Sequence, residues 1–436
     1  MLKLQVQADA DSSFKSWSGA CQGSATSCEL RLNQSGSVTA NFGLSPAPGS
    51  EVDRLIAAMP ANSWKAITGT PMKDVCPLPY MRPQCEAVIS AWSGGSFDER
   101  RDRMLVFGGG HADSFYNSMF AFDLDSLRWQ RLTEMPAGAN GATPAPGWSD
   151  TRLETCGYYP KTANINLPAS VMMDGKPYVH WDQCFIEPVL SLLDLQQPRS
   201  DHTYGKVFVD RLNDRYCYLG GSAYPGGQAD SFGVDCLNPV TRQWQRVTRR
   251  PLNVGGRGQT ALDAQGQLWY VNDMNGPIAK LDPRNLQWTT VGFVNYEAGG
   301  GTDIDRRRNQ LYALVLLPDG SHVLRRFELG DSTRLQAQPS YTQLNPSGST
   351  PTQIGNRPGF VYADDLDRFY AWGGGRTMSI FDPSSQTWTQ ITASGDDPGA
   401  QQTWGTYGRF RWSPRRGVFV LVNSTSQDVF LFKPGP

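Results

Sequence analysis

The stretch Leu127-Arg-Trp-Gln-Arg-Leu-Thr133 returns almost unchanged further along the chain as Arg242-Gln-Trp-Gln-Arg-Val-Thr248. Four other segments share its form, an aromatic residue followed by polar and β-branched residues. They are Asn62–Thr68, Leu286–Gly292, Pro339–Asn345 and Gln386–Thr392. A repeat of roughly fifty residues is typical of chains in which each unit is one supersecondary element stacked on its neighbours. The repeat therefore predicts the architecture before any catalytic motif is considered.

Each repeat unit predicts four strands. An apolar first strand runs into a charged turn, as in Asp98–Arg103 and Asp210–Arg215. A second strand then ends in glycines, as in Met104–Gly110 and Phe369–Gly375, and a third strand precedes the aromatic one. Period-two alternation with glycine punctuation predicts radial four-stranded sheets and therefore an all-β fold.

The paired glycines and the later tryptophan resemble those of kelch-type β-propellers, the family that includes the central domain of galactose oxidase. The last unit contains only three strands, Tyr407–Trp412, Val418–Val422 and Asp428–Phe432. We expect Asn62–Thr68 to supply the missing aromatic strand, because this would close the ring and pair an open sheet edge. The aromatic strands predict six blades, with a seventh inside residues 134–198 as the alternative.

Residues 1–48 are expected to form a separate module. Its short alternating strands with Cys21 and Cys28 resemble the small cysteine-paired β-repeats of bacterial surface and secreted proteins. We expect residues 49–61 to be a linker, and residues 62–436 to form the propeller with a long insertion at 134–198. The N-terminus has no apolar signal region, so we expect the chain to begin inside a longer exported protein with further domains.

The eight cysteines predict disulfides rather than a metal or redox motif. No pair has Cys-x-x-Cys spacing. The expected pairs are Cys21–Cys28, Cys76–Cys85, Cys156–Cys184 and Cys217–Cys236. Such usage predicts a secreted or cell-surface protein. A net charge of −1 gives no electrostatic reason to expect nucleic acid as a partner, and no apolar stretch is long enough to predict membrane insertion.

Functional residues are expected on one face of the ring. The charged turns occupy the other face, where we expect a solvated rim. Three of the four histidines, His111, His180 and His202, fall in loops or insertions on the first face. We predict His111, His202 and Tyr204 as catalytic residues. The predicted substrate-binding residues are Asp113, Asn117, His180, Trp181, Tyr224, Arg257, Arg357, Arg376 and Tyr407.

These residue types suit an extracellular polysaccharide, and lyase chemistry on a uronate polymer in particular. Proton abstraction beside a carboxylate requires that carboxylate to be neutralised, which Arg or His⁺ does, and a base such as Tyr or His. Propeller lyases acting on uronic-acid polymers resemble this arrangement in kind.

Other interpretations stay open. A non-catalytic carbohydrate- or protein-binding module needs fewer assumptions. We predict no cofactor; zinc or copper at His111, His180 and His202 is the alternative, including an oxidase related to galactose oxidase. Individually, the loop histidines and arginines also suit plain structural roles, such as hydrogen bonds to backbone carbonyls, and Asp113 suits a turn cap.

Overall fold

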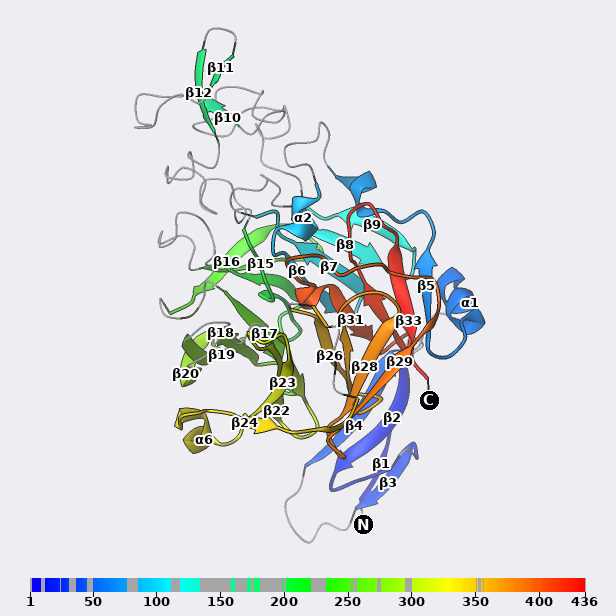
Figure 1. Cartoon of the computed structure of the whole chain (residues 1–436). Coiled ribbons are helices and arrows are strands. Elements are labelled where there is room, and N and C mark those ends of the chain that lie inside the picture. The colour runs from blue at the N-terminus through cyan, green and yellow to red at the C-terminus, as the bar shows by residue number, and fades with distance from the viewer. Residues whose placement is uncertain are drawn as a thin grey trace.

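The computed structural model describes residues 2–8, 12–23, 25–30, 37–44, 50–76, 85–110, 118–133, 158–160, 171–173, 176–180, 198, 201–220, 233–251, 254, 257–272, 276–294, 300–349, 351, 354–355 and 357–435. Most of these residues form six radial sheets around a central axis (Figure 1). The prediction of an all-β propeller with six blades is confirmed.

Four consecutive strands form each of the first five blades. Blade one contains β6 (Gly94–Asp98), β7 (Arg103–Phe107), β8 (Phe120–Asp123) and β9 (Arg128–Arg131). Blade two contains β13 (Val207–Asp210), β14 (Arg215–Leu219), β15 (Gly233–Leu237) and β16 (Trp244–Arg249), and blade three β17 (Gly258–Leu262), β18 (Leu268–Asn272), β19 (Gly276–Asp282) and β20 (Gln287–Val294). Blade four contains β21 (Gly300–Asp305), β22 (Gln310–Leu316), β23 (His322–Glu328) and β24 (Thr342–Leu344), and blade five β26 (Gly359–Ala363), β27 (Arg368–Trp372), β28 (Thr377–Asp382) and β29 (Thr387–Thr392).

Blade six takes its outer strand from the other end of the chain. It contains β31 (Phe410–Ser413), β32 (Val418–Leu421) and β33 (Val429–Lys433), and β5 (Ser63–Ile67) pairs antiparallel with β33. The predicted closure of the ring is therefore confirmed. Short parallel strands extend the outer edges of blades five and six, β25 (Ser347–Gly348) beside β29 and β30 (Ser394–Gly395) beside β5.

The repeated aromatic residue has a packing role. It lies opposite an apolar residue of the third strand in its own blade. The phenylalanine–tryptophan pairs are Phe122–Trp129, Phe381–Trp388 and Phe432–Trp64, with ring centroids 5.3, 5.1 and 5.1 Å apart. Such aromatic cross-strand pairs stabilise a sheet. The same register in blade six identifies Trp64 as a true member of the repeat.

The N-terminal strands form two small sheets. β1 (Leu2–Gln5) pairs with β3 (Ser27–Leu30), and β2 (Ser12–Gly19) pairs with β4 (Val38–Leu44). The boundary at residue 48 stays a prediction. The expected linker 49–61 contains helix α1 (Glu51–Ala58), and the ammonium of Lys433 bonds to the carbonyls of Ile56 and Met59, both at 2.9 Å, which fixes the helix to the end of β33.

Short elements complete the fold. They are η1 (Met72–Val75), α2 (Ala87–Ser90), α6 (Ser332–Gln336), η3 (Tyr407–Arg409) and a three-stranded sheet of β10 (Tyr158–Pro160), β12 (Lys176–His180) and β11 (Val171–Met173) within the insertion. In the parts of the chain that the structure describes, no helix is long and apolar enough to cross a membrane.

Three of the four expected disulfides are present. They are Cys21–Cys28, Cys76–Cys85 and Cys217–Cys236, the last joining neighbouring strands β14 and β15. Cys156 and Cys184 lie outside the described residues. Because disulfides persist only where thiols are not kept reduced, these bonds indicate an oxidising environment such as the extracellular space.

The expectation of a solvated rim is wrong for many carboxylates of the charged turns. Asp98, Asp102 and Asp303 are buried, and partly exposed carboxylates such as Asp214 and Asp367 bind arginines of neighbouring blades. Arg101 of blade one bonds both carboxylate oxygens of Asp214 in blade two at 2.6 Å, and Arg308 of blade four bonds Asp367 of blade five at 2.6 and 2.8 Å. We call this side of the ring the turn face. Bidentate pairs fix orientation as well as distance, so they set how successive blades meet.

Candidate functional site on the loop face

The loop face lies opposite the turn face. Among the described residues, it consists of segments that lead into first strands and of residues that follow second strands. Contacts join the two kinds of segment: Gly110 donates its backbone N–H to the carbonyl of Asp201, and Gly374 forms a β-bridge with Ala400. The expected grouping of these segments on one face is therefore seen in the structure.

Four side chains on the loop face sit on backbone with positive φ. They are Trp92 (50°), Tyr204 (46°), Arg357 (53°) and Tyr407 (49°), each just before the first strand of its blade. The other non-glycine residues with positive φ precede second or fourth strands at the turn face. Left-handed backbone at a bulky residue costs on the order of 1–3 kcal/mol and persists where the surrounding structure imposes it.

An unbroken chain of aromatic rings crosses this face. Trp404 stacks on Trp92 with centroids 4.3 Å apart and planes 24° apart, and Trp92 lies 4.5 Å from His202. His202 meets Tyr204 at 5.9 Å, and Tyr204 meets Tyr407 at 5.6 Å. Trp404 is 45% exposed, whereas His202, Tyr204 and Tyr407 are buried. Solvent exposure therefore decreases along this chain, from the exposed indole of Trp404 to the buried phenols of Tyr204 and Tyr407.

Two arginines stand beside the phenols. The side chain of Arg257 is exposed and hydrogen-bonds to Tyr204, and the charge of Arg357 also acts on Tyr204. Burial raises the pKa of Tyr204 above its usual value, although both arginines act in the opposite direction. Tyr204 is consequently a protonated phenol at neutral pH, able to donate a hydrogen bond or a proton.

Backbone contacts between blades hold these side chains in place. Tyr204 donates its N–H to the carbonyl of Trp92 at 2.7 Å, and Thr406 donates to the carbonyl of Arg357 at 2.8 Å. A Cβ at Gly94 would lie 1.7 Å from the carbonyl oxygen of Tyr204, so the approach of these two segments requires glycine there.

Arg409 links the backbone segments that carry these aromatic residues. It is fully buried and donates to the carbonyls of Ser93, Val422 and Gly405 at 3.0, 2.6 and 2.6 Å. Burial lowers the pKa of Arg409 to about 9. Since Ser93 follows Trp92 and Gly405 follows Trp404, this arginine fixes the segments that carry the stacked indoles.

A groove lies on the same face of the ring. Its volume is about 550 Å³, and it is lined by Gly373–Gly375, Asp397 and Gly399–Thr403 among others. Thr403, the residue before Trp404, is the lining residue nearest in sequence to the aromatic chain. Glycines allow a ligand to approach the backbone closely here.

The structure brings together five of the predicted site residues: His202, Tyr204, Arg257, Arg357 and Tyr407. Arg376 is exposed in the loop between β27 and β28, beside the groove. His180 is the last residue of β12. His111, Asp113, Asn117, Trp181 and Tyr224 lie outside the described residues.

The three-histidine metal site therefore stays a prediction, because His111 is not among the described residues. Within the described part of the chain, no group of three or more His, Cys, Asp or Glu side chains is arranged to hold a metal ion.

Trp92 is the central residue that the sequence prediction missed. A signal for it exists, because the same kind of residue stands before the first glycine of several blades. The segments are Trp92-Ser-Gly94, Tyr204-Gly205, Arg257-Gly258, Arg357-Pro-Gly359 and Tyr407-Gly408. An aromatic residue or arginine just before a glycine thus occurs where the chain enters blades one, two, three, five and six on the loop face. We call this end of the propeller the mouth of the ring.

Comparison with known proteins identifies no family. No family model and no curated protein matches this chain. Among solved structures, a gluconolactonase from Xanthomonas campestris is 10% identical with a TM-score of 0.43, covering 80% of this chain and 87% of its own. An auxiliary nutrient binding protein from Bacteroides ovatus is 10% identical with a TM-score of 0.41, covering 80% and 70%. The class that the fold itself defines is a disulfide-bonded six-bladed β-propeller, and the kelch subtype stays a prediction.

Proposed function

We propose that this protein is a secreted propeller that binds an acidic extracellular polysaccharide on its loop face. The observation that carries the proposal is the stacked Trp404–Trp92 pair leading to Arg257 and Arg357. An exposed, rigid indole offers a flat apolar surface to a sugar ring, and a guanidinium suits a uronate carboxylate.

The groove on the loop face supports a polymer rather than a single sugar. It is open, and it is lined by Gly399–Thr403, which precede Trp404 in the sequence, and by Gly373–Gly375 of blade five. In a polymer bound there, one sugar would stack on Trp404. The following sugars would lie over backbone amides and over the side chains of Gln401 and Gln402.

Binding to uronate polymers tests the proposal. We expect Trp404→Ala to weaken binding of an oligouronate at least about fivefold, since buried aromatic anchors contribute 1 kcal/mol or more. Phe293→Ala is the matched control, because Phe293 is also a large exposed aromatic residue (48%) but lies on the outer strand of blade three. Equal affinity of the two variants, measured by calorimetry, would remove the basis of the proposal.

Arginine substitutions test the charge requirement separately. We expect Arg257→Gln to weaken binding of the oligouronate and to leave binding of a neutral oligosaccharide of the same length unchanged. The wild-type affinity should fall with added salt because the arginine is exposed.

A lyase is the second candidate, favoured by the 5.9 Å contact between His202 and Tyr204. In such a reaction His202 takes the C5 proton of the uronate. The C–H electron pair becomes the C4–C5 double bond, the C4–O bond to the next sugar breaks, and Tyr204 gives its proton to the leaving oxygen. The raised pKa of Tyr204 supports the acid role rather than the base role.

The unsaturated product gives a direct assay. Incubation with uronate polymers should raise ultraviolet absorbance, and Tyr204→Phe should abolish this rise while binding persists. Binding without any rise in absorbance in the wild type would leave the propeller as a binding module only.

A further inference from the structure

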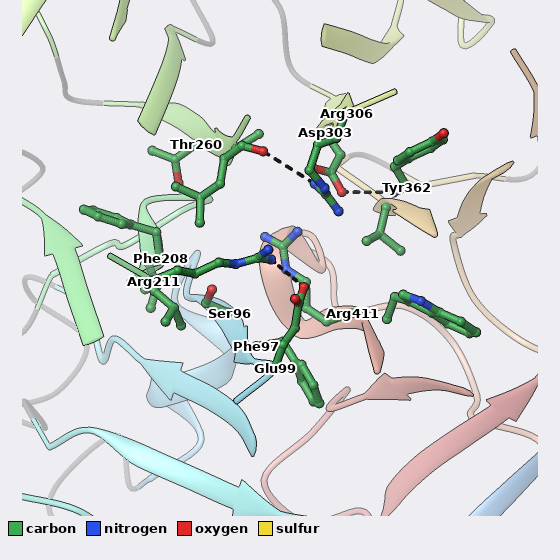
Figure 2. Close-up of a pocket in the computed structure, with 16 residues that line it drawn as sticks. Ser96, Phe97, Glu99, Phe208, Arg211, Thr260, Asp303, Arg306, Tyr362 and Arg411 are labelled. Carbon is green, nitrogen blue, oxygen red and sulfur yellow. Dashed lines mark hydrogen bonds and ion pairs between the residues drawn. The ribbon is translucent and has the colours of Figure 1, made fainter. Parts of the chain in front are cut away.

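A small cavity lies on the axis of the ring, below the mouth. Its volume is about 60 Å³, and residues from the first strands of all six blades, or from the turns after them, line it (Figure 2). This volume holds a few water molecules or one small ion, and it is too small for a sugar.

The cavity contains more cations than anions. Arg211, Arg306 and Arg411 line it together with Glu99 and Asp303. The two carboxylates are committed: Glu99 forms an ion pair with Arg211, and Asp303 lies 3.6 Å from Arg306 and accepts the N–H of Tyr362 at 2.9 Å.

Arg306 has a second anionic partner besides Asp303. Its guanidinium bonds the carboxylate of Asp364 at 2.6 Å, and Asp364 does not line the cavity. Arg306 therefore contacts two carboxylates and Arg211 contacts one.

Arg411 is the guanidinium left without an anion. Its Nε donates to the carbonyl of Gly408 at 3.2 Å, and among the described residues no carboxylate forms an ion pair with it. Burial lowers the pKa of Arg411 below its usual value, and the charges of Arg306 and Arg211 act in the same direction, whereas Asp303 and Glu99 oppose it. Arg411 is half-buried in the ring. A charge partly withdrawn from bulk water without a contacting counter-charge is costly, and an anion in the cavity would reduce that cost.

We propose that the axial cavity binds one small monovalent anion, such as chloride or formate, at the Nη groups of Arg411. Figure 2 shows the side chains of Arg411 and Arg211 pointing toward each other in the middle of the cavity, and Ser96 lies in the same lining. The Ser96 hydroxyl supplies a further donor. The site is independent of ligand binding at the mouth. The bound anion stabilises the propeller by neutralising the positive charge of Arg411 in the cavity.

Thermal unfolding in sodium chloride and in sodium gluconate at equal ionic strength tests this site. Gluconate is too large for the cavity. At tenfold excess over its dissociation constant, chloride should raise the folding equilibrium constant about tenfold, which is roughly 2 °C in Tm for a chain of this size. Arg411→Gln should abolish the difference between the two salts. Arg284→Gln, an exposed arginine on the turn face, should retain it.

Bromide provides a direct readout that does not require a variant. Crystals grown in sodium bromide should show an anomalous peak against the guanidinium of Arg411. The proposal is overturned if that peak is missing from the cavity, or if Arg411→Gln folds and keeps the full chloride effect.

Discussion

Removal of Arg416 should destabilise this protein more than removal of any exposed arginine. The side chain of Arg416 is fully buried, and its Nε donates at 2.6 Å to Asp102, which is also fully buried. Its remaining nitrogens form ion pairs with Asp53 at the start of helix α1 and with Asp125 in blade one. One side chain therefore joins blade six, blade one and the segment that closes the ring.

The expected magnitude follows from what Arg416→Met leaves behind. The carboxylate of Asp102 keeps only the hydroxyl of Ser413, at 2.6 Å, as a described side-chain partner. A buried charge left uncompensated costs about 3–5 kcal/mol. Exposed pairs contribute about 0–1 kcal/mol, so Arg284→Met is the matched control, since Arg284 is 56% exposed and bonds Asp282 at 2.9 Å.

Urea unfolding of both variants measures these losses. Adding Asp102→Asn to Arg416→Met removes the orphaned charge, so the double variant should recover roughly 1–3 kcal/mol of the loss. Asparagine suits this position because Asp102 has a φ of 53°. The reasoning is refuted if Arg416→Met costs no more than Arg284→Met, or if the two substitutions simply add.

Three further perturbations probe separate parts of the fold. Replacing Cys217 and Cys236 by alanine should lower the free energy of unfolding by about 3 kcal/mol in oxidising buffer, and this gap to wild type should narrow in reductant. Arg308 lowers the pKa of Asp367 from 3.8 to about 2, so the stabilisation of the folded state by this pair is complete above pH 4 and is lost as the pH falls toward 2. About 1–2 kcal/mol of the free energy of unfolding should be lost in this range, after allowing for partial exposure, and Asp367→Asn should lose less stability in acid, as measured by pH-dependent unfolding. Arg357→Gly should be about 1 kcal/mol more stable than Arg357→Ala in urea, because only glycine relieves the positive φ; equal stabilities would mean that the backbone is not strained.

The features that the sequence predicted well are those set by local repetition. Alternation along each strand, the aromatic residue on the fourth strand and the incomplete last unit were enough to predict six blades and the closing role of Trp64. The cysteine spacing was equally informative, because Cys21–Cys28 and Cys76–Cys85 are close in sequence and Cys217 lies opposite Cys236 on a paired strand. Each of these inferences depends on contacts within one blade or between cysteines that are near in sequence.

The features that were missed depend on contacts between blades. The turn carboxylates look like solvent-facing charges in the sequence, and only the packing of neighbouring blades shows that Asp98 is buried against Tyr216 of blade two and Asp102 against Arg416 of blade six. Trp92 was missed for the same reason, because its partners His202 and Trp404 come from two other blades. No single repeat determines which of its side chains contact those of the neighbouring blades.

Left-handed backbone occurs on both faces of the ring. At the turn face, the residues before second strands, such as Asp214 and Asn309, belong to types that tolerate positive φ, whereas those before fourth strands include Leu127, Arg242 and Leu286. At the loop face, the same backbone carries Trp92, Tyr204, Arg357 and Tyr407, for which it is unfavourable. The fold does not require this conformation at every blade, because Arg257 occupies the corresponding position of blade three without a positive φ. Glycine would satisfy the backbone at lower cost, so the large aromatic and cationic side chains at these positions of the loop face agree with the ligand recognition that we propose there.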